Sequence, residues 1–283
     1  MAQRCFSNHL HMYFSLILLV TFTLSCIHPP EDHSVLNAQK AQDHTDSTQQ
    51  EIPEPIVASE IGGIPTPAGY QRTPTSQNSF GQYLRSVALR TDNDTVFQHD
   101  GEPKSRQDVH HAILTIDVGT RDLQQCADAC MRLRGEYLFA QKRYDEIHFN
   151  FLRDNKPRYY KDHADSEHSH KSFRKYMDYI FSYANTASLR RELPNVSVDD
   201  MQIGDIFIQQ GLPYGHAVMV VDMAENAEGK KIFMIAQSYM PAQDIHILKN
   251  FNDSNNSPWY SVDFGDSLIT PQWDFYATDL KRF

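Results

Sequence analysis

The residues best suited to chemistry in this chain of 283 residues are a histidine, a glutamine and two cysteines. His216 follows Gly215 and begins an apolar run, and Gln237 ends the next apolar run after a short polar turn. A glutamine oxygen accepts a hydrogen bond from a ring N–H and so holds an imidazole in the tautomer needed for proton abstraction. The spacing predicts such a pair on adjacent strands. A strand-end histidine and a sheet-rim glutamine without a function are the alternative interpretation.

Cys126 and Cys130 are the cysteines of the C-terminal 220 or so residues, and either would supply a nucleophile. The first turn of a helix lowers the pKa of a thiol. Cys126 is the better candidate because Cys130 lies one turn deeper, and Gln125 would help to bind an oxyanion. A helix with Asp122 as its N-cap instead makes Cys126 the fourth helical residue, on an apolar stripe. In that case the thiol serves core packing.

Polar and aromatic residues after the second strand indicate a different role, ligand recognition. Ser238, Tyr239 and Gln243 crowd the loop that follows Gln237, and Trp259 lies further along the chain. Loops on a rigid scaffold commonly carry binding residues, and aromatic side chains suit a groove for a glycan or peptide. The alternative is a hydrogen-bonded loop that closes the sheet, with the tryptophan in the core.

No metal site or cofactor is expected. Cysteines four residues apart on one helix are poorly aimed for a disulfide. His168 and His170 lie in a charged segment without a cysteine at a zinc-site spacing.

The helices and strands expected around these residues indicate an α+β fold. Helices are expected over residues 79–89, 122–141, 172–183 and 186–193, from N-caps and helical apolar spacing. Strands are expected over residues 111–117, 144–151, 203–208, 216–222 and 232–237, with a hairpin turn at 224–230. Helices followed by an antiparallel meander define the α+β class.

The N-terminal segment predicts export. Residues 12–24 are an apolar run too short to span a bilayer, which needs roughly 20 residues, so residues 1–25 are expected to be a signal peptide. The run ends in Thr23-Leu24-Ser25-Cys26, which resembles a bacterial lipobox and predicts lipidation of Cys26. An ordinary signal peptide followed by a chance cysteine is the alternative.

Composition divides the rest of the chain into a tether and one domain. Residues 26–56 contain no aromatic residue and six acids, so they are expected to be a disordered acidic tether. Residues 57–283 are expected to form a single α+β domain. The chain has 26 Lys and Arg against 36 Asp and Glu, a net charge of −10, which disfavours binding to nucleic acid.

The order of motifs is similar to that of the NlpC-type cysteine peptidases, a papain-like superfamily of cell-envelope enzymes. The resemblance rests on an ordered series of motifs: Gly204-Asp205, an apolar run, Gly215-His216, a second apolar run, a turn and the predicted strand that ends at Gln237. The resemblance implies a papain-like fold with Cys126 as nucleophile, His216 as base and Gln237 as orienter. Gln125-Cys126-Ala127 replaces the usual Asp-Cys-Ser, which puts the nucleophile in doubt.

Longer strings resemble a bacterial family known as domain of unknown function 4846, common in the Bacteroidetes and often lipoprotein-like. They include Arg132-Leu-Arg-Gly-Glu-Tyr137, Ala236-Gln-Ser-Tyr-Met-Pro-Ala-Gln243 and Ser257-Pro-Trp-Tyr260, and the resemblance covers residues 64–283. Asn185 stands where glycine is expected. This family name carries no activity.

Two functions are therefore expected from the sequence. The first is a papain-like cysteine hydrolase of the cell envelope that acts on an amide bond, for example in a peptidoglycan peptide. The second is a non-catalytic surface lipoprotein that binds a glycan or peptide. Both imply an exported protein in the periplasm or on the outer membrane, held to the membrane through a lipid anchor only.

Overall fold

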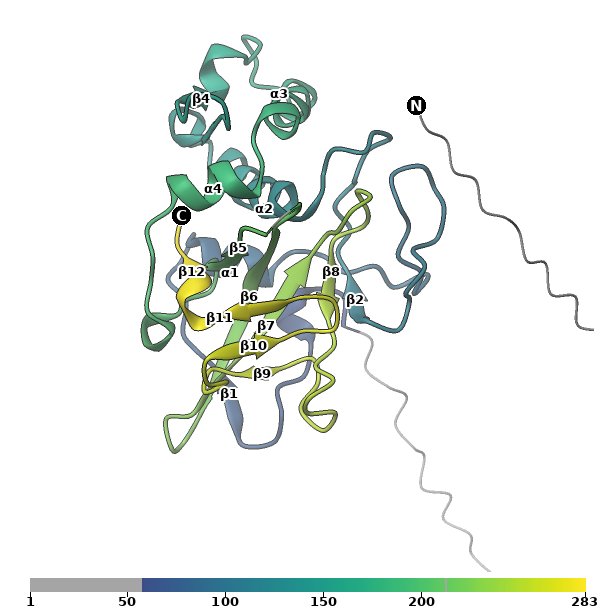
Figure 1. The fold of residues 1–283 in the computed structure, drawn as a ribbon, viewed down its shortest axis with the longest axis vertical. Helices are drawn as coiled ribbons and strands as arrows, with labels where there is room; N and C mark the ends of the chain where they lie inside the picture. The colour runs from purple at the N-terminus through teal and green to yellow at the C-terminus, as the bar shows by residue number, and fades with distance from the viewer. Residues whose placement is uncertain (1–57, 212) are drawn as a thin grey trace, which may run out of the picture. The chain divides into compact units, whose positions relative to one another are not determined.

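An antiparallel sheet forms the centre of the domain (Figure 1). The computed structural model describes residues 58–211 and 213–283; the expected signal peptide, the tether and Cys26 lie outside the described residues. The strands are β1 (Tyr70–Arg72), β2 (His110–Ile113), β3 (His148–Asn150), β4 (Pro157–Tyr159), β5 (Ile206–Gln209), β6 (His216–Asn226), β7 (Lys231–Gln237), β8 (His246–Leu248), β9 (Tyr260–Ser261), β10 (Ser267–Ile269), β11 (Asp274–Tyr276) and β12 (Leu280–Lys281). The central sheet has the order β12-β5-β6-β7-β8-β2, with β1 paired to β6 and β9 to β7.

Four α-helices are described, α1 (Phe80–Arg85), α2 (Cys126–Ala140), α3 (His170–Tyr183) and α4 (Thr186–Glu192). Short 3-10 turns occupy Ile61–Gly63, Tyr144–Glu146, Tyr160–Asp162, Val198–Asp200 and Ala277–Asp279. Ser79, Ser169 and Asn185 cap α1, α3 and α4 with side-chain oxygens that accept backbone N–H groups. Within the described ranges, no helix is both long and apolar enough to cross a membrane.

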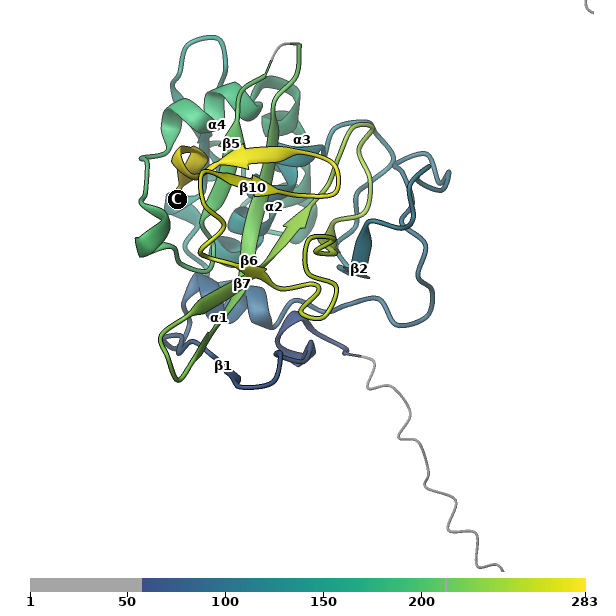
Figure 2. The same cartoon turned by 60° about the horizontal axis from the view of Figure 1, so that its bottom comes forward.

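Each face of the central sheet has its own hydrophobic core. Ala217, Met219 and Val221 of β6 pack into the core shared with α2, α3 and α4. Because successive strand residues point to opposite faces, Val218 and Val220 pack on the other side, in the core shared with hairpin β10–β11. Figure 2 shows this hairpin on the opposite side of β6 from α2. His216, two residues before Val218, therefore belongs to the hairpin face.

The α+β class is as predicted, but the chain order is only partly helices first. β1 and β2 precede α2 and join the same sheet as the late strands, β1 on β6 and β2 on β8. The strands with which β1 and β2 pair lie more than a hundred residues away along the chain. Local periodicity therefore cannot predict these pairings.

The predicted start of the second helix is wrong. α2 begins at Cys126, and its N-cap is Gln125. Asp122 does not cap the helix, because its Oδ1 accepts hydrogen bonds from the backbone N–H of Ala242 (2.7 Å) and from Nε2 of Gln125 (2.9 Å). A contact with a distant loop thus replaces the local capping bond and shortens the helix.

The segment predicted as a strand from residue 144 also differs in detail. It opens with the 3-10 turn Tyr144–Glu146 and becomes β3 only at His148, which pairs with β4. β4 lies within residues 155–170, the charged segment that also contains His168 and His170.

Candidate active site

Cys126 occupies the first position of α2, where the backbone N–H groups have no partner within the helix. Asp128 stabilises this end, since its Oδ2 accepts the backbone N–H of Gln125 at 3.2 Å. Because α2 begins at Cys126 and not near residue 122, the cysteine occupies the first helical position and not the fourth. This is where the helix dipole acts most strongly on a thiol.

The Cys126 sulfur lies against the backbone of β6 on both sides of His216. Sγ is 3.9 Å from the carbonyl oxygen of Gly215 and 3.8 Å from Oγ1 of Thr186, the first residue of α4. Burial raises the pKa of the thiol and Asp128 adds to this, whereas Thr186 and the backbone N–H groups of Ala127 and Ala217 lower it. The net direction is upward, so the resting thiol is protonated at neutral pH.

A cavity of about 330 Å³ opens beside this sulfur. The N-terminal ends of α2 and α4 form one wall, and the β5–β6 connection and the loop after β7 form the other. The cavity lining includes Gln125, Cys126, Thr186, Tyr214, Gly215 and Met240. A carbonyl carbon bound here would lie beside the sulfur and the first N–H groups of α2.

His216 is held in a fixed orientation under aromatic side chains. Its ring centre is 4.9 Å from that of Tyr239, 5.5 Å from Trp273 and 5.9 Å from Phe275. Nε2 is 2.8 Å from Oε1 of Gln237, which is an acceptor, so Nε2 carries the ring proton. Nδ1 is left with the lone pair, and no hydrogen bond within residues 58–211 and 213–283 engages it.

The imidazole is neutral at physiological pH. Burial lowers the pKa of His216 to about 4, with a smaller contribution from Lys104 in the same direction and an opposing one from the Gln237 hydrogen bond. A neutral thiol and a neutral imidazole with a free lone pair are the pair that a proton transfer at the moment of attack requires. No hydrogen bond joins Cys126 Sγ to the ring among the described contacts.

The structure brings Cys126, His216 and Gln237 to one end of the sheet but gives other candidates different places. Trp259 is 1 % exposed and donates its Nε1–H to the carbonyl oxygen of Pro65, so it does not line a groove. Ser238 and Gln243 are also buried, and Ser238 Oγ accepts the backbone N–H of Gln243. Ser238 and Gln243 close the loop and Trp259 lies in the core, as the alternative interpretation has it.

Gln125 and Tyr239 remain partly exposed. The amide of Gln125 is engaged with Asp122, which leaves the backbone N–H groups of α2 as the donors for an oxyanion. Tyr239 lines an open hollow of about 470 Å³ together with Arg106, Gln272 and Trp273.

Several residues around the site carried no sequence signal. Thr186 reaches the sulfur from a different helix. Gln272 accepts from Gln237 and from Lys104, which lies 168 residues away along the chain from Gln272. None has a spacing relation to the histidine or the cysteine.

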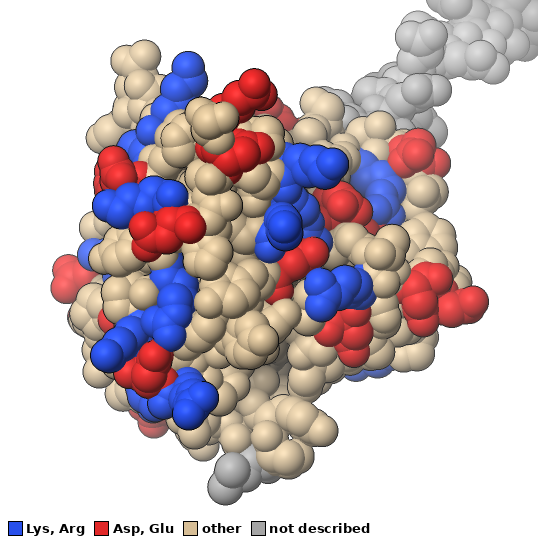
Figure 3. Space-filling view, turned by 90° about the horizontal axis from the view of Figure 1, so that it is seen from above, with Lys and Arg blue, Asp and Glu red and all other residues tan. Residues whose placement is uncertain are grey.

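The charge distribution around the domain is mixed. On the face seen in Figure 3, Lys and Arg side chains lie beside Asp and Glu side chains, so a polyanion would meet both positive and negative charges there.

In the described part of the chain, no three His, Cys, Asp or Glu residues are placed to hold a metal ion.

Comparison with known proteins gives one result. A family model described as "Domain of unknown function (4846)" matches residues 62–282. No curated protein and no solved structure matches the chain.

Proposed function

The chain belongs to the family described as domain of unknown function 4846, and we propose that it is a papain-like cysteine hydrolase of the cell envelope that cleaves an amide bond. One observation carries the proposal: the sulfur of Cys126, at the first position of α2, lies against the β6 backbone on both sides of His216. Cys126 is 5 % exposed, and its place at the start of α2 beside a cavity distinguishes it from Cys130, which is 1 % exposed.

We propose the following reaction. The thiol proton has to reach Nδ1 of His216 around the end of β6, because the His216 side chain lies on the hairpin face of the sheet and α2 lies on the other face. The sulfur then attacks the carbonyl carbon, and the N–H groups at the start of α2 stabilise the oxyanion. The imidazolium then gives its proton to the leaving amine, and the carbon–nitrogen bond breaks. Water, deprotonated by the same nitrogen, hydrolyses the acyl-thioester and returns the free thiol. Gln237 keeps Nε2–H in place throughout.

The site supports an extended peptide as substrate. The cavity beside Cys126 has room for a few side-chain-sized groups, and the hollow at Tyr239 and Trp273 lies on the other side of the histidine. A peptidoglycan peptide from the cell envelope has this form, and it fits the export expected from residues 1–25.

The thiol test compares two cysteines in one chain. We expect iodoacetamide to alkylate Cys126 much faster than Cys130 in the native protein at pH 7.5, because Cys126 borders the cavity and Cys130 is 1 % exposed inside the core. Mass spectrometry of the digested protein measures both rates. His216→Ala should slow Cys126 to the rate of Cys130, whereas Lys142→Ala, an exposed change, should leave the ratio unaltered.

Equal slow alkylation of both thiols in the folded protein would contradict catalysis. It would favour the second candidate, a non-catalytic lipoprotein that binds a glycan or peptide. One observation supports that candidate: Tyr239 and Trp273 offer partly exposed rings beside Arg106 and Asp274 in the open hollow.

Localisation is tested at Cys26. If this residue is acylated after export, the wild-type protein should sediment with membranes, and Cys26→Ala should release it or block its processing. Labelling with a radioactive fatty acid, followed by fractionation, measures both effects. A wild-type protein found wholly in the soluble periplasmic fraction would rule out the lipid anchor.

A further inference from the structure

Behind His216, a chain of polar groups leads from the buried Gln237 through the half-buried Gln272 to the buried Lys104. Nε2 of Gln237 donates to Oε1 of Gln272 at 2.9 Å, and the same oxygen accepts from Nζ of Lys104 at 2.9 Å. Gln237 is 1 % exposed and Lys104 is 6 % exposed. An ammonium group has only donors, so Gln272 must turn its oxygen, and not its NH2 group, toward Lys104 and Gln237.

His246 supplies a second fixed contact to the same amide. It lies directly opposite Gln237 in the β7–β8 pairing. Its Nδ1 is 2.9 Å from the carbonyl oxygen of Asp244, so Nδ1 carries the proton. Burial lowers the pKa of His246 to about 3, which keeps the ring neutral and Nε2 an acceptor. That nitrogen is 3.3 Å from Nε2 of Gln237.

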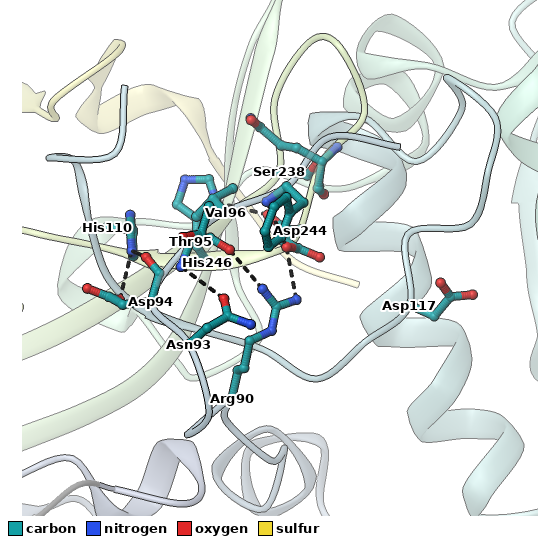
Figure 4. A network of polar contacts seen from close by, with 12 residues as sticks. Arg90, Asn93, Asp94, Thr95, Val96, His110, Asp117, Ser238, Asp244 and His246 are labelled. Carbon is teal, nitrogen blue, oxygen red and sulfur yellow. Dashed lines mark hydrogen bonds and ion pairs between the residues drawn. The ribbon is translucent and has the colours of Figure 1, made fainter. Parts of the chain in front are cut away.

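Hydrogen bonds and ion pairs fix the segment that contains His246, as Figure 4 shows. Asp244 forms an ion pair with Arg90 (2.9 Å) and accepts the backbone N–H of Phe97. His110, on the neighbouring strand, is bonded to Asp94. The acceptor offered to Gln237 therefore belongs to a rigid layer.

These contacts allow one orientation of the Gln237 amide. If the amide were flipped, its oxygen would face the oxygen of Gln272 and the lone pair of His246, and both N–H groups would lose their acceptors. The oxygen therefore faces Nε2 of His216 at 2.8 Å. We propose that Lys104 and Gln272 are positioning residues that fix the tautomer of His216 through the side-chain amide of Gln237.

Lys104 suits this role because it is a buried donor without a carboxylate partner among its described hydrogen bonds. In the Gln243 orientation that satisfies its neighbours, that amide oxygen lies 3.2 Å from Nζ of Lys104 and 3.0 Å from the backbone nitrogen of Tyr239. The ring of Tyr239 lies 5.0 Å from Nζ and stabilises the charge from its face. The inference rests on the proposed function only in one respect: a hydrolase uses the lone pair that this tautomer leaves on Nδ1.

The experiment reads the tautomer directly. Long-range proton–nitrogen NMR of the full chain, labelled with nitrogen-15 in its histidines, distinguishes Nε2–H from Nδ1–H, and His216→Ala identifies the His216 signals by their loss. We expect a single Nε2–H tautomer in the wild type at pH 7. Gln272→Met and Lys104→Met should give a mixture that contains Nδ1–H. Gln272→Glu, which keeps an acceptor for both neighbours, should retain the wild-type pattern.

Two results would overturn the inference: Nδ1–H in the wild type, or an unchanged Nε2–H tautomer in both methionine variants. The wild-type spectrum and Gln272→Glu decide the first point even if a methionine variant does not fold. Cys126 alkylation separates the two proposals. A tautomer that responds as expected, in a protein whose Cys126 reacts as slowly as Cys130, would contradict the hydrolase and leave the positioning role standing.

Discussion

Replacing Asp222 by asparagine should lower the free energy of unfolding by about 3–5 kcal/mol, the cost of breaking a buried ion pair from one side. The Asp222 side chain is fully buried in β6. Its Oδ2 accepts Nε of Arg72 at 2.7 Å, and its Oδ1 accepts Nε of Arg85 at 2.6 Å. Asparagine removes the charge and presents an NH2 group to one arginine. Two partly buried guanidinium groups then lose their counter-charge.

Urea unfolding followed by circular dichroism measures this change. Asp108→Asn is the matched control, because Asp108 pairs with Arg106 on the surface and its side chain is 61 % exposed. We expect the control to change stability by less than about 0.5 kcal/mol. Because Arg72 lies on β1 and Arg85 on α1, Asp222→Asn should also speed proteolysis of the segment before residue 90. Equal stabilities of the two variants would contradict the structural role.

Acidification should destabilise the domain through His216, by about 3 kcal/mol between pH 7 and pH 4. The pKa of His216 is lowered to about 4 in the folded protein, whereas an unfolded histidine has a pKa of about 6.5. Between these values the unfolded chain binds a proton that the folded chain does not. The stabilisation is therefore complete above pH 6.5 and is lost as the pH falls toward 4.

Other buried groups titrate as well, so the measurement is a difference. Burial raises the pKa of Asp128 well above its usual value, and this carboxyl group changes stability in the opposite direction. The free energies of unfolding of the wild type and His216→Gln should be compared at several pH values. Both proteins contain Asp128 and His246, so the contributions of these groups cancel in the difference between the two free energies. We expect the wild-type advantage to shrink by about 3 kcal/mol as the pH falls. Parallel curves would show that His216 is not buried in the neutral form.

The sequence by itself determined the parts of the protein that depend on neighbours along the chain. Apolar runs and the polar turn between them predicted strands at β5, β6 and β7, and the same register placed His216 and Gln237 at strand ends that meet. The helices at α3 and α4 began within two residues of their predicted starts, since local serine and asparagine side chains cap them.

Tertiary structure decided what depends on partners far along the chain. The start of α2, and with it the first-turn position of Cys126, depends on a hydrogen bond from Ala242 to Asp122, 120 residues apart. The burial of Trp259 depends on Pro65, and the orientation of Gln237 depends on Lys104 and Gln272. A hydrogen bond forms wherever a donor meets an acceptor in space, so sequence spacing cannot identify such partners. Local periodicity therefore predicted β5, β6 and β7, and long-range polar contacts determined how the site is arranged.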